Sequence, residues 1–176
     1  MRVSGCRSPA MDRNDRILVT HVGSLPRSQM VSDVVLAVEQ GMQVSDEPFD
    51  AVVSDAVDTE VGRQKKIGID IVSDGEFSKI TYASYVQHRL TGFSGDSSLV
   101  TPADLDEFPG AAEKSSTRRH SPSLFRRPLC TGPVAVRTHA PIEGDIRRMQ
   151  AAVAKHKPNG AFLTSASPGL IAIELR

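Results

Sequence analysis

The spacing of hydrophobic residues predicts short strands and helices that alternate along this chain. Residues 17–22 alternate loosely between hydrophobic and polar types and end at a glycine, which predicts a first strand. Residues 69–73 form a short β-branched run bounded by glycines, which favours a buried strand. Between them, hydrophobic residues recur at spacings of three and four over residues 46–67, which predicts a long amphipathic helix. Ser45 is placed to cap this helix, and Gly68 to end it.

The same pattern continues beyond residue 76. The further predicted elements are helices within residues 32–41, 78–92 and 145–157 and strands at residues 129–136 and 161–164. Strands and helices in this order are typical of a parallel α/β fold. They amount to about half of an eight-stranded barrel, so we expect an incomplete (β/α)8 fold of the TIM-barrel type.

Chain length and local composition set the expected domain organisation. At 176 residues the chain has room for one ordinary domain. Residues 1–16 have no periodicity and are expected to be a disordered leader, so the partial barrel domain covers residues 17–176. Within it, residues 93–124 change to polar and turn-forming types with little periodicity. We expect a long irregular excursion there, of the kind that serves as a lid or a linker.

Composition and charge narrow the class of ligand. Lys plus Arg and Asp plus Glu number 21 each, so no net field attracts nucleic acid or an anionic membrane. No hydrophobic run approaches the ~20 residues of a membrane span, and the two cysteines, Cys6 and Cys130, do not suggest a disulfide framework. We therefore expect a cytoplasmic protein that binds a small neutral or zwitterionic molecule, with no nucleic-acid or membrane partner.

The loop after the first predicted strand is one candidate binding site. It offers His21, the backbone N–H groups of Gly23 and Ser24, the Ser24 hydroxyl and the Arg27 guanidinium. Glycine allows a ligand to approach the backbone closely, and a guanidinium holds a carboxylate through two hydrogen bonds. The loop therefore suits an anionic group. The alternative is an ordinary turn, in which Ser24 bonds its own backbone and Arg27 is a solvated charge.

A second candidate follows the strand at residues 69–73. Asp74 and Glu76 flank Gly75, and two acids at the carboxyl end of a parallel strand can bind an ammonium group or share a proton. The alternative is an Asp-Gly turn in which Glu76 caps the next helix together with Ser78. If the two strands are neighbours in one barrel, both loops face one ligand.

Metal and nucleotide motifs are missing from the sequence pattern. The five histidines are scattered, and no His-x-Cys or Cys-x-x-Cys spacing occurs, so we predict no metal site within the chain. The sequence also shows no P-loop, dinucleotide fingerprint or nucleophile elbow. The candidate chemistry therefore rests on the two loops.

Five segments form a combination that is more specific than any one of them. They are THVGSLPR at residues 20–27, RQKKIGIDIVSDGE at 63–76, RLTGF at 89–93, CTGP at 130–133 and ASPG at 166–169. This combination resembles the N-terminal part of the catalytic barrel of the cobalamin-independent methionine synthase family and its short stand-alone relatives.

The resemblance implies a (β/α)8 barrel that transfers a methyl group from a methylated folate to the thiol of homocysteine, with zinc as the cofactor that activates the thiol. It implies that Gly23 and Ser24 bind the amino-acid carboxylate and that Glu76 binds the amine. His21, Arg27 and Asp74 are implied as neighbours of that site. The family's zinc ligands lie in the second half of its barrel and have no counterpart in this chain.

We therefore expect a truncated methyltransferase of the 5-methyltetrahydropteroyltriglutamate–homocysteine S-methyltransferase type, without zinc ligands. Two alternatives remain open. One is a thiol alkyl transferase of the same superfamily with another small thiol as substrate, and the other is a non-catalytic half-barrel that binds a partner. An open barrel exposes a strand edge, which favours association with the missing half-barrel or self-association.

Overall fold

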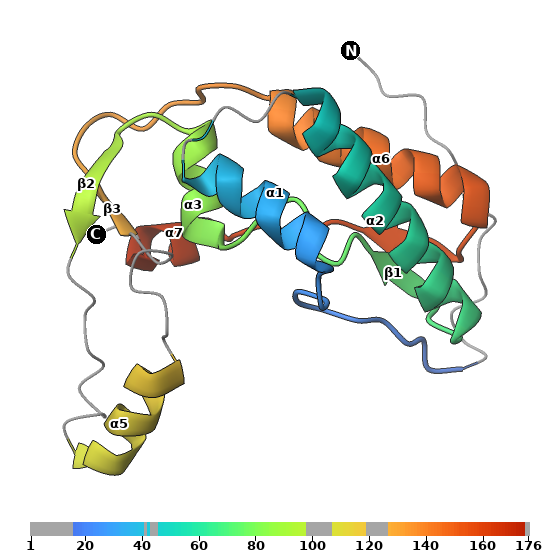
Figure 1. Cartoon of the computed structure of the whole chain (residues 1–176), viewed down its shortest axis with the longest axis horizontal. Coiled ribbons are helices and arrows are strands. Elements are labelled where there is room, and N and C mark those ends of the chain that lie inside the picture. Colours follow the sequence, from blue (N-terminus) through green and yellow to red (C-terminus); the bar gives the residue numbers. More distant parts are fainter. Residues whose placement is uncertain (1–15, 41, 43–45, 98–106, 119–126, 175–176) are drawn as a thin grey trace. The chain divides into compact units, whose positions relative to one another are not determined.

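The computed structural model describes residues 16–40, 42, 46–97, 107–118 and 127–174. The chain divides into two compact units, and Figure 1 shows their elements. The first unit combines the chain up to Ile80 with His139–Ser165, and the second combines Thr81–Thr138 with the residues from Ala166 onward. All six predicted site residues therefore lie in the first unit.

A short parallel sheet forms the centre of the first unit. Strand β1 (Ile71–Ser73) pairs in parallel with β4 (Gly160–Phe162), and their register places Ser73 opposite Phe162. Ile71 also forms a parallel bridge with Thr20, so β1 lies between the two partners. The strand predicted at residues 17–22 is thus reduced to one bridge, and the carboxyl ends of three parallel segments meet at one edge.

Buried Asp70 ties the three segments of this sheet together. Its carboxylate accepts hydrogen bonds from the Val19 N–H at 2.9 Å and the Asn159 side chain at 3.2 Å, and it forms an ion pair with Arg16. These contacts, above all the one with Arg16, hold the pKa of Asp70 well below its usual range. Arg16 belongs to the predicted leader, whose other residues, 1–15, lie outside the described part of the chain.

Three helices share a hydrophobic core with the sheet of the first unit. They are α1 (Gln29–Glu39), α2 (Asp46–Lys66) and α6 (Ala140–His156). Helix α2 contacts both of the others, and Figure 1 shows α2 and α6 side by side. The buried side chains that hold them together are Val31 and Val35 of α1, Val53, Val57 and Val61 of α2, and Met149 and Ala152 of α6. This cluster is the hydrophobic core of the unit.

The helix boundaries agree with the sequence pattern to different degrees. The helix predicted over residues 46–67 is confirmed to within one residue, while its predicted cap, Ser45, lies outside the described residues. Helix α1 begins earlier than predicted because Ser28 caps it, accepting a hydrogen bond from the Val31 N–H. Helix α6 also begins earlier, at Ala140, with a proline in its first turn.

The second unit is built from short elements. They are α3 (Tyr82–Arg89), β2 (Phe93–Ser97), α5 (Pro109–Arg118), β3 (Arg127–Cys130) and α7 (Pro168–Glu174). Strands β2 and β3 pair in an antiparallel manner, with Phe93 opposite Cys130. Val86 and Phe93 form a small buried cluster, against which Leu90 and Ile171 pack.

This unit differs from the sequence prediction in three places. The segment 93–124, expected to be irregular, contains β2 and α5, while its residues 98–106 and 119–124 lie outside the described residues. The strand predicted at 129–136 ends at Cys130 and is antiparallel, with only a bridge from Val136 to Leu90 beyond it. Residues 168–169, predicted to be loop, begin α7 because proline suits the first position of a helix.

Among the described helices, none is both long and apolar enough to cross a lipid bilayer.

Candidate functional site

The carboxylate of Glu76 is the meeting point of the two predicted loops. Its Oε2 atom accepts a hydrogen bond of 2.5 Å from the Ser24 hydroxyl, and its Oε1 atom accepts one of 2.8 Å from the Thr164 hydroxyl. Glu76 is buried, with 7% of its surface exposed, while Ser24 is exposed. The three residues follow Thr20, β1 and β4, so they lie where the parallel segments of the sheet end.

The backbone at Glu76 is held in an unusual conformation. Gly75 has φ of 65° and Glu76 has φ of 60°, in the left-handed region that a residue with a Cβ rarely adopts. Arg27 donates hydrogen bonds to the Glu76 carbonyl at 2.8 Å and to the Lys79 carbonyl, and Asp74 Oδ1 accepts from the Glu76 N–H at 3.1 Å. These contacts fix the turn that directs Glu76 toward Ser24.

The structure brings four of the six predicted residues together, and each makes a different contact. They are Ser24, Arg27, Asp74 and Glu76. Ser24 bonds Glu76 rather than its own backbone, so the ordinary-turn interpretation does not describe it. Arg27 is not a solvated charge, because it is bound to backbone carbonyls and its Nε atom is buried. His21 lies with Gly23 within the loop, where a ring nitrogen is 3.1 Å from the Gly23 carbonyl oxygen, and Gly23 has φ of 102°.

Two residues of this arrangement are not among those predicted from the sequence. Thr164 supplies the second hydroxyl on Glu76, and the buried ammonium of Lys79 donates to the Thr164 carbonyl at 3.1 Å. A signal for Thr164 existed, since it closes the strand predicted at 161–164 and so falls at the same sheet edge as the acidic turn. Lys79 gave no such signal. We call Ser24, Arg27, Glu76, Lys79 and Thr164 the Glu76 cluster.

Asp74 lies beneath the turn and is almost fully buried. Burial raises its pKa because a low-dielectric environment disfavours the charged carboxylate, and the nearby carboxylates of Asp145 and Glu76 act in the same direction. The ammonium of Lys79 and the N–H of Glu76 oppose this effect. Asp145 in turn forms a buried ion pair of 2.7 Å with Arg148 of α6.

The raised pKa of Asp74 predicts a pH-dependent cost to stability. The folded state binds this proton more tightly than the unfolded state, so stability falls as the pH rises above about 4, the usual value for aspartate. The substitution Asp74→Asn would keep a side-chain oxygen for the Glu76 N–H but would remove the titrating group. We expect the free energy of unfolding of Asp74→Asn, relative to the unmodified protein, to increase between about pH 4 and pH 7.

Chemical unfolding at a series of pH values measures this difference. Gln150→Ala, which removes a side chain without an ionisable group at an exposed position of α6, is the control and should change stability by the same amount at each pH. A pH-independent difference for Asp74→Asn would contradict the assignment.

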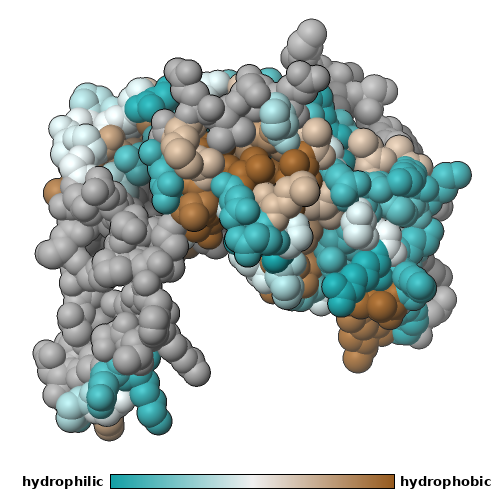
Figure 2. Space-filling model, in the orientation of Figure 1, coloured by the Kyte–Doolittle hydropathy of each residue, from teal (hydrophilic) through white to brown (hydrophobic). Residues whose placement is uncertain are grey.

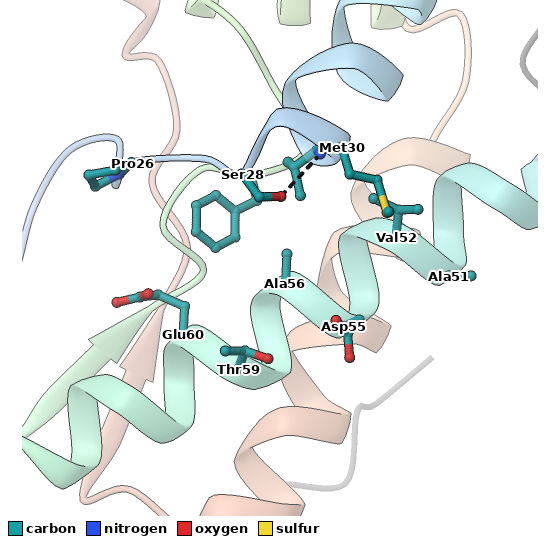
Figure 3. A pocket seen from close by; sticks show the side chains of 11 residues that line it. Pro26, Ser28, Met30, Ala51, Val52, Asp55, Ala56, Thr59 and Glu60 are labelled. Atoms are coloured by element: carbon teal, nitrogen blue, oxygen red, sulfur yellow. Dashed lines mark hydrogen bonds between the residues drawn. The ribbon is translucent and has the colours of Figure 1, made fainter.

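A separate cavity of about 450 Å³ lies between α1 and α2 (Figure 3). Ala56, Thr59 and Glu60 of α2 line one side of it, and Ser28 at the start of α1 lines another. None of the six predicted site residues lines this cavity. It is therefore distinct from the Glu76 cluster.

Zinc, implied by the family resemblance, does not fit the side chains that the structure describes. No group of three or more His, Cys, Asp or Glu residues there is arranged to hold a metal ion. Cys130, the cysteine within the described ranges, is exposed on β3 in the second unit.

Comparison with known proteins places the chain in a family. Residues 17–157 match the model of the catalytic domain of the cobalamin-independent synthases. Proteins named 5-methyltetrahydropteroyltriglutamate–homocysteine methyltransferase are similar to it: that of Caulobacter vibrioides is 28% identical over 146 residues, 75% of this chain, and that of Acidiphilium cryptum is 26% identical over 143 residues, 73% of this chain.

The chain spans about a fifth of the length of these relatives, 19% of the first and 18% of the second. The protein of Bradyrhizobium diazoefficiens gives a similar result, with 27% identity over 145 residues, 74% of this chain and 18% of the relative. The matched residues include both loops of the Glu76 cluster and the three helices that support them. The chain belongs to the family of cobalamin-independent synthase catalytic domains.

Proposed function

We propose that this chain is part of a methyltransferase of the 5-methyltetrahydropteroyltriglutamate–homocysteine type and that the Glu76 cluster binds the amino-acid end of its thiol substrate. The observation that carries the proposal is the contact of Ser24 and Thr164 with the two oxygens of Glu76. Family membership supports the proposed reaction class, and this contact supports a site of suitable charge.

In this proposal each end of the amino acid meets a group of opposite character. The Glu76 carboxylate accepts hydrogen bonds from the substrate ammonium, a charge-assisted interaction that is stronger than one between neutral groups. The N–H groups of Gly23 and Ser24 and the Ser24 hydroxyl donate to the substrate carboxylate. We propose His21, Arg27 and Asp74 as neighbours of these contacts. Binding at two charged points fixes the orientation of the thiol, which is the protein's part in methyl transfer.

The wider assembly is also part of the proposal. We propose that the chain contributes the first segments of a (β/α)8 barrel and that the remaining strands, the methylated folate site and the zinc ligands come from other residues. Hydrophobic side chains support an interface on the first unit, since Ile17, Val22 and Met30 are 91%, 69% and 64% exposed. Figure 2 shows hydrophobic surface over the α1–α2 side of that unit.

Calorimetric titration of the 176-residue chain with L-homocysteine tests the binding proposal. We expect Glu76→Gln to weaken binding about ten-fold, because the ammonium loses its interaction with a charged carboxylate. Glu143→Gln, at an exposed position of α6, is the matched control and should bind as the unmodified chain does. Unchanged affinity in Glu76→Gln would remove Glu76 from the site.

Two further candidate functions predict different experimental results. A thiol alkyl transferase with another substrate would bind a simple thiol such as 2-mercaptoethanol at least as tightly as L-homocysteine. A half-barrel that acts only as a binding module would form a complex with a protein carrying the missing strands, which size-exclusion chromatography detects as a larger species. The buried carboxylate of Glu76 favours the substrate with an amine.

A further inference from the structure

We infer that Thr164 is a positioning residue that keeps the Glu76 carboxylate oriented toward the substrate ammonium once the Ser24 hydroxyl has turned to the substrate carboxylate. This inference rests on the proposed function. It goes beyond it by giving a role to a residue on a different strand segment from either loop.

The Ser24 hydroxyl cannot donate to Glu76 and to a substrate carboxylate at the same time. A serine hydroxyl has one proton and donates one hydrogen bond at a time. In the structure that proton lies between Ser24 Oγ and Glu76 Oε2, 2.5 Å apart. If the Ser24 hydroxyl instead donates its hydrogen bond to the substrate carboxylate, Glu76 loses this donor when the substrate binds. A carboxylate accepts up to about four hydrogen bonds, so an ammonium can bind while a second hydroxyl still orients it.

The position of Thr164 brings its hydroxyl to the Glu76 carboxylate. Ser73 lies opposite Phe162 in the parallel pair, so Thr164 extends beyond β4 to the same level as the turn that carries Glu76. From there its hydroxyl reaches the other carboxylate oxygen, Oε1, at 2.8 Å. A substrate carboxylate held by the Ser24 loop would meet Ser24 and need not displace Thr164.

The backbone of Thr164 is held by a buried cation, the ammonium of Lys79. The Lys79 ammonium donates to the Thr164 carbonyl at 3.1 Å, and only 5% of Lys79 is exposed. The carbonyl of Lys79 in turn accepts a hydrogen bond from Arg27, which also holds the Glu76 carbonyl. The backbones of Thr164 and Glu76 are therefore linked through Lys79 and Arg27, so the fold sets the distance between the two side chains.

A comparison of two ligands isolates this role. L-homocysteine and 4-mercaptobutyrate share the thiol and the carboxylate, and only the first has an amine. The dissociation constant of 4-mercaptobutyrate divided by that of L-homocysteine measures the contribution of the ammonium. We expect Thr164→Val to lower this ratio about five-fold, because the Glu76 carboxylate, a charged acceptor, loses the hydrogen bond from the Thr164 hydroxyl that orients it. Thr164→Ser restores the hydroxyl and should keep the ratio.

Thr20→Val is the matched control. It removes a threonine hydroxyl that donates to the Ile71 carbonyl at 2.7 Å in the same sheet and does not involve Glu76. It should leave the ratio unchanged. Thr164→Ala is a second variant without the hydroxyl and without added bulk, and thermal unfolding of each protein shows which variants are folded. In a Glu76→Gln background, Thr164→Val should have no further effect on the ratio.

The outcomes separate this inference from the proposed function. If the unmodified chain binds L-homocysteine no better than 4-mercaptobutyrate, the proposed function is wrong, and the role of Thr164 falls with it. If the unmodified chain prefers the amine but Thr164→Val and Thr164→Ala keep that preference, the positioning role alone is wrong. An equal weakening of both ligands would show a purely structural effect and would also overturn it.

Discussion

Replacing Gln64 by leucine is expected to lower the free energy of unfolding by about 4 kcal/mol. Gln64 lies on α2 with 2% of its surface exposed, and its side-chain amide makes two hydrogen bonds to the backbone of Ser73, the last residue of β1. The amide nitrogen donates to the Ser73 carbonyl at 2.8 Å, and the amide oxygen accepts from the Ser73 N–H at 3.0 Å.

The expected size follows from what leucine leaves behind. Leucine fills most of the volume of glutamine but satisfies neither backbone group, and each buried group without a partner costs about 1–3 kcal/mol. Urea unfolding measures the change as a lower midpoint with an unchanged slope. Gln29→Leu, at an exposed position of α1, is the control and should stay within about 0.5 kcal/mol of the unmodified protein. A loss below about 1 kcal/mol for Gln64→Leu would contradict the assigned bonds.

Gln64 also shows why part of the site was predictable and part was not. The periodic valines of α2 predicted the helix to within one residue, because burial of one apolar face determines where an amphipathic helix lies. The polar Gln64 interrupts that pattern, so its contact with β1 could not be read from it. Such a contact depends on the path of the chain after the helix, which periodicity does not encode.

The Glu76 cluster divides in the same way. The two loops were expected to face one ligand, because polar residues that follow neighbouring parallel strands share an edge of the sheet, and Ser24 does lie against Glu76. Arg27 is predicted from the sequence to be a ligand-binding cation, and in the structure its guanidinium donates to two backbone carbonyls. A left-handed turn at Glu76 needs such support. The Asp74-Gly75 pair indicated a turn, but no sequence pattern indicated that Glu76 itself adopts a positive φ.

The second unit shows the limit of pattern arguments most clearly. Strand β2 has the sequence FSGDS, in which only Phe93 is large and apolar, so it lacks the alternation that predicts a strand. It is a strand because β3 pairs with it and because Phe93 packs against Val86. The pairing partner β3 is distant in the sequence, so a local pattern does not reveal it. Gly92, which directly precedes β2, lies close to the backbone that follows β3.

Gly92→Ala is expected to destabilise this strand pair by about 3 kcal/mol. Gly92 has φ of 87°, which costs an L-residue about 1–2 kcal/mol. An added Cβ would also lie 2.6 Å from the carbonyl oxygens of Gly132 and Pro133, and these are backbone atoms that cannot rotate away. Hydrogen exchange at the Thr131 N–H, which donates to the Gly92 carbonyl at 2.8 Å, measures the loss as faster exchange.

Gly95→Ala separates the two causes. Gly95 lies within β2, the strand that Gly92 directly precedes, and has φ of 74°. The nearest atom to an added Cβ there, in the Leu129 side chain, is 4.0 Å away, which is ordinary contact. This variant carries the cost of the backbone conformation without the clash, so we expect it to lose about 1–2 kcal/mol. Equal losses in the two variants would mean that the backbone moves away from an added Cβ at Gly92 without cost. The close approach of Gly92 to Gly132 and Pro133 would then not stabilise the pairing of β2 and β3.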